Sequence, residues 1–435
     1  MPITKLPRDI LLHVFECLNQ DYDATLVPSI LCCKQWRPLA ETVLYGDVFL
    51  NTRRLTKLLD TFAYTSRQIR SLTLVMEAVR VNPYDYTLAI EEITTRLNVL
   101  QRLSTHIEKM GLISLSISID LPYPYTPSRE LASIISHLPN SCICLDIDGN
   151  RNGLIARVDA SRLPSSHLCD SIRAVLPRLR HFRVRYPQVC SALFGTELDN
   201  RAFEAVRAPN LRSCLINLSL REPRAPTSAH VLAAPCNAAP LPINGVTPQY
   251  PLPFPPLIPR LREFARLNSA TLERLWIIDI QPRNPEMPNY WGAWVRRDFL
   301  LDSSMPIPMD SIRAFVQDSY LARVPAKSGG TVDWISTPER LEALAEDGFW
   351  SQTTNGTRLA TPMLREYDCV PMPSTKEECL KKENFTCTLW QNEQATGEKL
   401  FPEAPGPLVK EWDIKERVPA GWRRDNWLGA PMVRL

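Results

Sequence analysis

Glycine and histidine are scarce in this 435-residue chain, which contains 15 Gly and 6 His beside 39 Pro. With so few glycines, the sequence has no Gly-rich loop that would cradle a phosphate, and the many prolines predict short, turn-broken elements. No run of about 18 apolar residues occurs, so we expect no membrane-spanning helix. Asp9 and His13 interrupt the first apolar stretch and no small-residue cleavage site follows, so we also expect no secretory signal.

An excess of charge of either sign is missing as well. The 50 Lys and Arg nearly balance the 47 Asp and Glu, which leaves a net charge of +3 at pH 7. A chain with this balance has no strong net electrostatic attraction to nucleic acid or to a membrane surface, and we expect neither as a partner. The 12 Cys show no framework spacing. We therefore expect reduced thiols and a location in the cytoplasm, the nucleus or both.

Motifs for metal binding and catalysis are also lacking. Cys369, Cys379 and Cys387 have nine and seven residues between them, and no His lies beyond His230. Without a CxxC pair, this spacing does not predict a zinc site. The sequence has no Gly-x-Ser-x-Gly elbow and no His-Glu-x-x-His motif. We expect no metal, no cofactor and no catalysis in this chain.

The first fifty residues carry an apolar pattern typical of short amphipathic helices. Apolar side chains at positions 10, 11, 14, 15 and 18 recur at three- and four-residue spacing after Pro7, which suits a first helical turn. A second stripe runs from Leu26 to Trp36, and Pro38 is expected to end that helix near Arg37 and open a third. Three short helices in about 45 residues present more apolar surface than so small a unit buries, which predicts a partner, either another part of this chain or another protein.

The register of these residues resembles the F-box family. Leu6-Pro7 opens the first helix, and the block Leu31-Cys32-Cys33-Lys34-Gln35-Trp36 closes the second, within residues 4–50. Cys32 stands where the family more often has valine, a small change in apolar volume. We expect Cys33 to pack inside the helices and Cys32 to face the partner. An unrelated three-helix core is the alternative.

This resemblance implies a docking surface for the S-phase-kinase-associated adaptor of an SCF ubiquitin ligase and, through that adaptor, for a cullin scaffold. Aliphatic and aromatic anchors in a desolvated centre carry the affinity of such interfaces. Transferred by position, the expected adaptor-binding residues are Leu6, Pro7, Ile10, Val14, Phe15, Leu18, Leu26, Leu31, Cys32 and Trp36.

Beyond residue 50, a pattern of the form apolar-x-x-apolar-x-apolar recurs. Several copies follow a Pro-containing turn, and helix-like stretches such as 128–138 and 169–176 lie between them. Helix, turn and strand in repetition resemble a leucine-rich-repeat solenoid, with irregular spacing and without the repeat's Asn in most copies. An ordinary α/β domain is the alternative. The copies begin at Ile69, Leu112, Cys142, Leu179, Leu211 and Leu272.

The strand residues between the buried positions are expected to form the concave face of this solenoid. Arg183 and Arg185 alternate with apolar residues, so both guanidinium groups are expected to leave the core on one side. Residues 170–224 hold ten Arg, no Lys and five acidic residues, and Arg binds phosphate and carboxylate bidentately. A phosphorylated or acidic target segment is therefore a hypothesis for this face, and a solvated strand face is the favoured interpretation. The expected substrate-binding residues are Arg183, Arg185, Asp146, Asp148 and Trp276.

These patterns divide the chain into three parts of an α/β fold. Residues 1–50 are the expected three-helix F-box, residues 51–285 the irregular leucine-rich-repeat-like solenoid, and residues 286–435 an irregular Trp- and Pro-rich accessory region. Within the solenoid, residues 222–259 hold 11 Pro in 38 positions and predict an extended or disordered insertion. In the last region, capping residues predict helices that begin at Ser336 and at Ser374.

Together with the resemblance, the sequence predicts a non-catalytic substrate-recognition subunit of an SCF-type ubiquitin ligase. The adaptor would bind the F-box, an unidentified protein target would bind the rest of the chain, and catalysis would come from proximity. Two alternatives stay open. One is an adaptor-bound F-box protein that acts outside the cullin complex, and the other is an enzyme with a site in the Trp-rich region.

Overall fold

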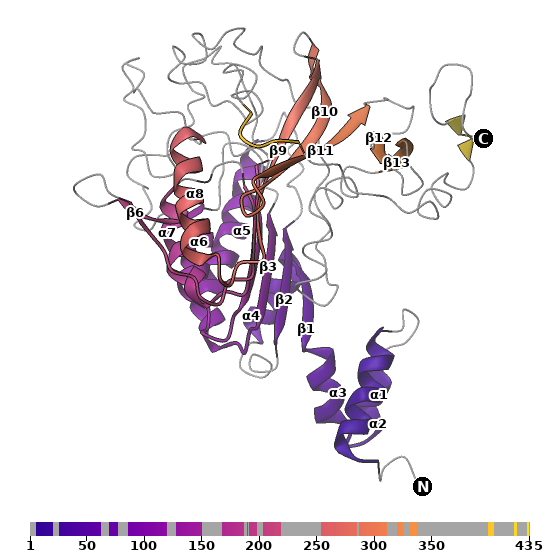
Figure 1. Cartoon of the computed structure of the whole chain (residues 1–435). Coiled ribbons are helices and arrows are strands. Elements are labelled where there is room, and N and C mark those ends of the chain that lie inside the picture. The colour runs from indigo at the N-terminus through magenta and orange to yellow at the C-terminus, as the bar shows by residue number, and fades with distance from the viewer. Residues whose placement is uncertain are drawn as a thin grey trace.

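The computed structural model shows a small N-terminal group of helices that continues directly into a mixed α/β domain (Figure 1). The first strand begins three residues after the third helix ends, so the two parts are joined without a linker. The structure describes residues 6–20, 26–61, 69–76, 86–119, 128–149, 168–186, 189, 191–197, 203–218, 254–284, 287–310, 320–325, 331–336, 399–403, 422–423 and 433–434.

Three helices, α1 (Arg8–Gln20), α2 (Val27–Cys32) and α3 (Arg37–Leu44), form the N-terminal part, which we call the three-helix module. Their starts follow the predicted signals. The N–H of Leu11 donates to the Pro7 carbonyl over 3.1 Å, and α2 and α3 each have proline in the first turn, where a missing N–H costs nothing. The prediction that α2 continues to Arg37 is wrong.

Helix α2 stops at Cys32 because Cys33 has an extended backbone, with φ −157° and ψ 161°. The chain then turns so that the Trp36 ring packs edge-on against Phe15, at 5.6 Å between ring centroids. The Trp36 carbonyl accepts from the Leu39 and Ala40 N–H groups at the start of α3. Packing of the half-buried tryptophan against Phe15 therefore accompanies the end of the helix.

A single sheet of eleven strands organises the α/β domain, in the order β1-β2-β3-β4-β5-β8-β9-β10-β11-β12-β13. Strands β1 through β9 in this order pair in parallel, and β9 through β13 pair antiparallel. The parallel strands are β1 (Asp47–Asn51), β2 (Ser71–Met76), β3 (Ser114–Ile119), β4 (Cys144–Asp148), β5 (His181–Arg185), β8 (Ser213–Asn217) and β9 (Arg274–Asn284). The antiparallel strands are β10 (Met287–Asp298), β11 (Ser303–Asp310), β12 (Tyr320–Pro325) and β13 (Thr331–Ser336). Two small sheets pair β6 (Gly195–Glu197) with β7 (Phe203–Ala205) and β14 (Trp422–Arg423) with β15 (Val433–Arg434).

The α/β class is confirmed, and so are the six strands predicted from the recurring apolar pattern. Each strand begins two residues after the first apolar residue of its copy, as at Ile69 before β2 and Leu179 before β5. That leading residue is buried in every copy, because it closes the core beneath the turn that precedes the strand. Along β3, β4 and β8 every residue is then buried, on both faces of the sheet.

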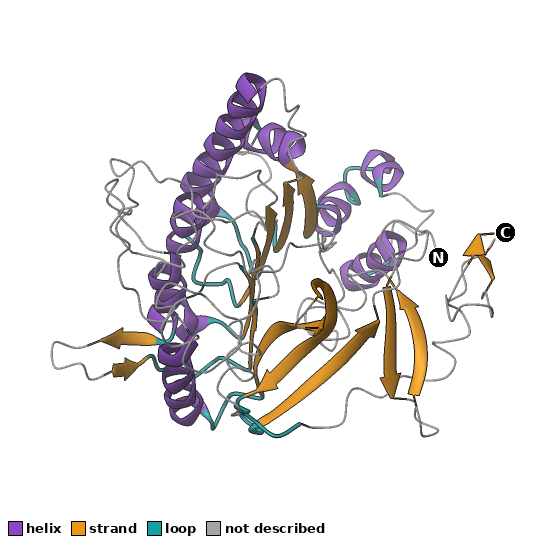
Figure 2. Ribbon diagram, turned by 90° about the horizontal axis from the view of Figure 1, so that it is seen from above, coloured by secondary structure: helices purple, strands orange, loops and turns teal. Residues whose placement is uncertain are grey.

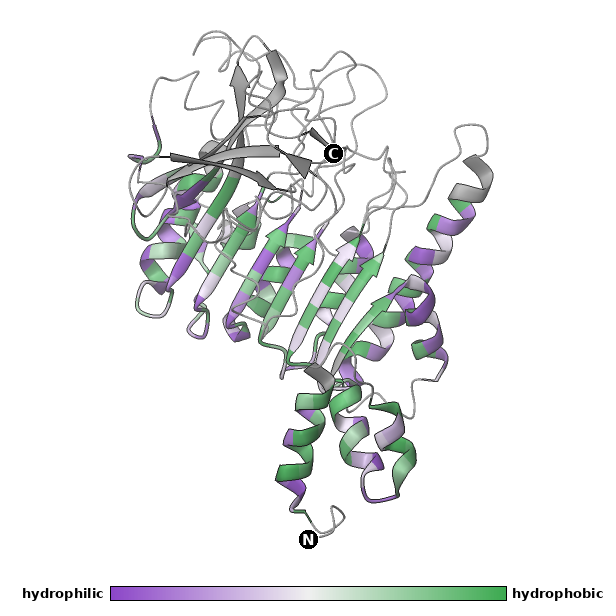
Figure 3. Ribbon diagram, turned by 90° about the vertical axis from the view of Figure 1, so that its right-hand side faces the viewer, coloured by the Kyte–Doolittle hydropathy of each residue, from purple (hydrophilic) through white to green (hydrophobic). Residues whose placement is uncertain are grey.

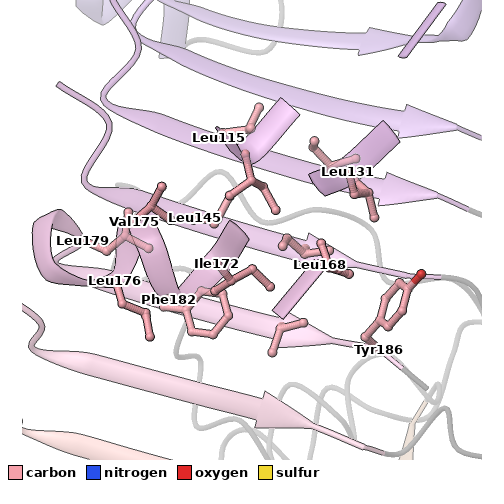
Figure 4. Close-up of a cluster of buried hydrophobic side chains, with 14 of the residues drawn as sticks. Leu115, Leu131, Leu145, Leu168, Ile172, Val175, Leu176, Leu179, Phe182 and Tyr186 are labelled. Atoms are coloured by element: carbon pink, nitrogen blue, oxygen red, sulfur yellow. The ribbon is translucent and has the colours of Figure 1, made fainter. Parts of the chain in front are cut away.

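Within the described part of the α/β domain, the helices that follow the strands in sequence cover one face of the sheet, and none of them covers the opposite face (Figure 2). Leu145 and Phe182 from the strands meet Ile172 and Val175 from the helix that precedes β5, and all four are buried (Figure 4). Burial of such side chains drives the packing of this layer. The covering helices are α4 (Thr52–Asp60), α5 (Tyr86–His106), α6 (Ser128–Ser136), α7 (Leu168–Val175) and α8 (Phe254–Asn268), with the 3-10 turns η4 (Ile107–Lys109), η6 (Leu176–Arg178) and η7 (Ser191–Leu193).

Helix α8 corrects the prediction of an extended insertion, because its first six residues belong to the Pro-rich segment. Pro259 lies inside this helix. The helix is held by its apolar face, since Leu257, Leu261 and Phe264 are buried in the main core. This packing offsets the hydrogen bond that Pro259 cannot donate. The rest of the insertion up to residue 253 lies outside the described residues.

The region expected to be irregular beyond residue 286 contains four strands of the main sheet. The expected boundary at residue 285 falls between β9 and β10, which pair antiparallel. The turn from β10 to β11 uses Asp302 at φ 46°, and the Asp298 carboxylate accepts from the N–H groups of Leu300 and Leu301. The expected helix after Ser336, the helix at Ser374 and the three cysteines of the rejected zinc site lie outside the described residues.

Candidate functional site

The three-helix module has its own hydrophobic core, separate from the core of the sheet. Leu11, Phe15, Leu26, Leu39 and Ala40 fill this core. Helices α1 and α3 supply four of these residues, while α2 contributes only Leu26, which precedes its first turn, and the partly buried Ile30. The module is thus a small folded unit, and several of its apolar side chains lie outside its core.

A row of aliphatic side chains lies outside this core. Ile10 and Val14 on α1 are 50% and 41% exposed, and Val27 and Leu31 on α2 are 50% and 78% exposed. Several water-exposed aliphatic residues in one small module are typical of a protein-binding surface. We call Ile10, Val14, Val27 and Leu31 the exposed aliphatic row. Val27 was not among the expected binding residues, although it belongs to the same apolar stripe of the sequence.

The expected adaptor-binding residues divide into three groups by exposure. The two buried ones could shape the module but do not reach its surface, and the half-buried ones pack against its core. The exposed members are Pro7, Ile10, Val14, Leu31 and Cys32, the half-buried ones are Leu6, Leu18 and Trp36, and the buried ones are Phe15 and Leu26. Cys33 is half-buried, and Cys32 is exposed.

A second group of polar residues alternates with core residues such as Leu145 and Phe182 along neighbouring strands, and therefore lies on the face of the sheet away from the helices. Figure 3 shows the alternation of hydrophilic and hydrophobic positions along these strands. The parallel register places Ser116, Asp146 and Arg183 side by side, and Ser118, Asp148 and Arg185 in the next row. The rows continue to Leu215 and Trp276 and to Asn217 and Ile278. The prediction that these strand residues share one face is therefore confirmed.

Two close ion pairs join β4 and β5 across these rows, and Arg183 Nη1 also lies 3.9 Å from Asp148 Oδ2. Arg185 binds the Asp148 carboxylate with two hydrogen bonds, from Nε to Oδ1 over 2.7 Å and from Nη2 to Oδ2 over 2.8 Å. Arg183 Nη1 donates to Asp146 Oδ1 over 2.7 Å, and the Ser116 hydroxyl donates to Asp146 Oδ2 over 2.6 Å. Aspartate and arginine at matching strand positions thus neutralise each other's charge and satisfy each other's hydrogen bonds within the sheet.

All four charged side chains are buried, with exposed fractions of 2% or less. Burial raises the pKa of Asp148 above its ordinary value, although Arg185 and Arg183 pull it the other way. The face is therefore not the solvated surface favoured from the sequence. The prediction that these residues bind a target stays untested, and in the structure their hydrogen bonds are made within the protein. Reversing the charge of both arginines would report on folding rather than on binding.

Trp276 extends this polar face at the point where the parallel strands end and the antiparallel ones begin. Its indole N–H donates to Asp298 Oδ2 over 2.8 Å. The Arg296 guanidinium lies over the ring at 4.0 Å from the centroid, and Arg274 lies at 5.3 Å. The indole is 6% exposed, so its aromatic face is occupied by these arginines.

The buried cysteines near this face carry raised pKa values. Burial raises the pKa of Cys142 to about 12 and that of Cys144 to about 11, so both thiols are protonated at neutral pH. Among the described residues, no three His, Cys, Asp or Glu side chains come together as metal ligands would. Within the same residues, no helix has the length and apolar character needed to cross a membrane.

His181 occupies the amino end of β5 on the same face, and its protonation should affect stability. Burial, followed by the positive charge of Arg180, lowers the pKa of His181 from 6.5 to about 4. Between these two pH values the unfolded chain binds a proton that the folded chain does not, so stability is lost as the pH falls. Because part of the ring is exposed, we expect a loss of roughly 1–2 kcal/mol rather than the about 3 kcal/mol of the full shift.

Urea unfolding of the wild type and of His181→Gln at pH 7 and pH 4.5 measures this loss. The glutamine variant, which cannot be protonated, should lose less stability than the wild type over that interval. Parallel losses in the two proteins would show that His181 does not contribute to the acid sensitivity.

Comparisons of the chain with protein-family models, with curated proteins and with solved structures found no match. The functional interpretation of both sites therefore depends on their own residues and geometry.

Proposed function

We propose that this protein is the substrate-recognition subunit of an SCF-type ubiquitin ligase and that its three-helix module is an F-box. The observation that carries the proposal is a module with a complete core of its own and a separate exposed aliphatic row. Four aliphatic side chains of the module are at least 41% exposed, with Leu31 at 78%, and exposed apolar residues concentrated in so small a unit favour a protein-binding surface. The S-phase-kinase-associated adaptor would cover this row, with Pro7 and Cys32 beside it.

We also infer that the α/β domain is a degenerate leucine-rich-repeat-like solenoid. What supports this is the recurrence of one unit, a helix or turn followed by a parallel strand, from β2 to β9. The units place apolar side chains toward the helices, and β3, β4 and β5 place polar side chains on the opposite face, where β8 and β9 add Leu215, Trp276 and Ile278. In this proposal the domain holds a target protein and raises its local concentration near the ubiquitin-charged enzyme.

Co-expression of the full-length chain with the S-phase-kinase-associated adaptor tests the proposal. We expect the two proteins to co-purify in equal amounts through size-exclusion chromatography. If the chain is made in folded form and the adaptor does not accompany it, the assignment of the F-box is wrong. Adding the cullin scaffold to the purified pair then separates a ligase subunit, which retains the cullin, from a protein that uses the adaptor outside the cullin complex.

A further inference from the structure

A short segment of the C-terminal region is bound to the main sheet. It comprises residues 399–403, Lys-Leu-Phe-Pro-Glu, which we call the strap. The strap lies beside the start of β11 (Figure 1), where Glu403 forms an isolated parallel bridge with Ser304. In the sequence, the 62 residues from 337 to 398 separate the strap from the end of β13. A distant part of the chain thus contacts the sheet in the way that a peptide ligand would.

The outer edge of β11 at Ser304 provides hydrogen bonds to the main chain of the strap. Among the described strands, β12 pairs with β11 only at Met309 and Asp310, so β12 does not use this part of the edge. The Ser304 N–H donates to the Pro402 carbonyl over 2.8 Å, and the Ser304 hydroxyl donates to the Phe401 carbonyl over 3.2 Å. Addition of an extended segment to a sheet edge is a recurring mode of peptide recognition, in which main-chain bonds give affinity and side-chain contacts give specificity.

Phe401 is the side chain that anchors the strap. It is 2% exposed and belongs to the main hydrophobic core. Its ring packs edge-on against Phe299, at 5.0 Å between ring centroids, and the Arg262 guanidinium from α8 lies over the ring at 5.6 Å from the centroid. Edge-to-face and cation–π contacts of this kind favour an aromatic side chain over an aliphatic one. We call Arg262, Phe299 and Ser304 the strap site.

Around this anchor, most of the strap lies at the surface. Leu400 packs partly against the core, but Lys399, Pro402 and Glu403 are exposed. The ion pair between Lys399 and Glu403 joins two residues of the strap itself, and both side chains are more than half exposed, so this pair is weak. Pro402 has no N–H with which to continue main-chain pairing. These are the contacts of a short peptide, and they must offset the entropy lost in closing a loop of 62 residues.

We propose that the strap site is a peptide-binding site and that the chain's own strap occupies it as a replaceable ligand. The class of ligand is an extended segment with an aromatic residue followed by proline, whose fixed φ helps to keep the segment extended. The strap has an advantage over a free peptide because its attachment to the chain raises its effective concentration at the site. This site lies outside the three-helix module, and the inference does not depend on the proposed function.

Fluorescence anisotropy with a labelled peptide of residues 396–406 tests this inference. Phe401→Ala removes the anchor of the chain's own strap, so we expect the full-length variant to bind the peptide about tenfold more tightly than the wild type, or better. The same peptide carrying Phe401→Ala should not bind. Because binding stabilises the folded state, the unmodified peptide should also raise the melting temperature of the Phe401→Ala protein toward the wild-type value.

Phe49→Ala is the matched control, because it makes the same chemical change at a phenylalanine that is 51% exposed on β1, at one edge of the sheet and away from β11. It should bind the peptide as weakly as the wild type does. Failure of folded Phe401→Ala to bind, or equal binding by Phe401→Ala and the wild type, would overturn the inference. So would concentration-dependent wild-type dimers that Phe401→Ala does not form, measured by light scattering, because the strap would then occupy a second copy of the chain.

Photocross-linking keeps the inference testable if Phe401→Ala does not fold. The peptide of residues 396–406, with benzoylphenylalanine in place of its phenylalanine, is cross-linked to the wild-type chain, and the product is mapped by mass spectrometry. We expect cross-links in residues 299–304 or in α8, suppressed by excess unmodified peptide. Cross-links confined to other residues would contradict the proposed site. Co-purification of the adaptor with the same preparation reports separately on the proposed function.

Discussion

Replacing Arg185 with methionine is expected to lower the free energy of unfolding by about 3–5 kcal/mol. Arg185 and Asp148 have no exposed surface in their side chains and share two hydrogen bonds. Methionine fills much of the same volume but leaves the Asp148 carboxylate buried without that partner. Most of this cost comes from keeping the Asp148 carboxylate buried after its closest cation is removed. The loss of one favourable contact contributes much less.

Arg180→Met provides the control, because it makes the same chemical change in a neighbouring but exposed arginine. It should change stability by no more than about 0.5 kcal/mol. Adding Asp148→Val to Arg185→Met should restore most of the loss, since replacing both members of a buried pair with apolar residues is often neutral. Urea unfolding of the four proteins measures these differences. If the single and double variants are equally destabilised, the ion pair is not the cause.

The pH dependence of the same variant gives a second check. Without Arg185, the pKa of Asp148 should rise further, because burial already raises it and its main cationic partner is gone. A raised pKa in the folded state means that the folded protein takes up a proton which the unfolded chain still lacks. The deficit of Arg185→Met relative to the wild type should therefore shrink as the pH falls toward 4.

The parallel strands were predictable because two-residue alternation determines which side chains share a face. Arg183 and Arg185 were placed correctly on the side away from the helices, and the register put Asp146 and Asp148 beside them. Alternation says nothing about what covers a face, so their burial could not be predicted. The signal that was available is the matching Asp-x-Asp and Arg-x-Arg spacing in adjacent copies, which predicts ion pairs across strands.

Other elements were missed because their usual local signals are absent. The turn between β10 and β11 has no glycine, and Asp302 supplies the positive φ of 46° instead. Helix α8 was hidden by its prolines, although Leu257, Leu261 and Phe264 recur at helical spacing and carry its packing. In the three-helix module, the apolar stripes predicted the helices but could not separate core residues such as Phe15 from surface residues such as Ile10.

Placing an acidic residue in the exposed aliphatic row is expected to weaken adaptor binding by about 30-fold or more, equivalent to about 2 kcal/mol. Ile10→Asp is the sharpest variant, because Ile10 is half exposed and lies in the first turn of α1, where the helix dipole favours a carboxylate. The module should therefore remain folded while its proposed interface gains a buried charge. Leu31→Asp should act in the same way from α2.

Leu301→Asp is the matched control, since Leu301 is 75% exposed and lies in the turn after β10, outside the module. It should bind the adaptor as the wild type does, which would show that the effect depends on location rather than on the substitution. The row gives a cleaner test than Leu6 or Trp36, because both of those pack against the module core and their loss would also unfold it. Isothermal titration of the purified variants with the adaptor measures the affinities. Wild-type affinity in both Ile10→Asp and Leu31→Asp would remove the exposed aliphatic row from any docking role, since a desolvated interface does not accept an unpaired carboxylate at its centre.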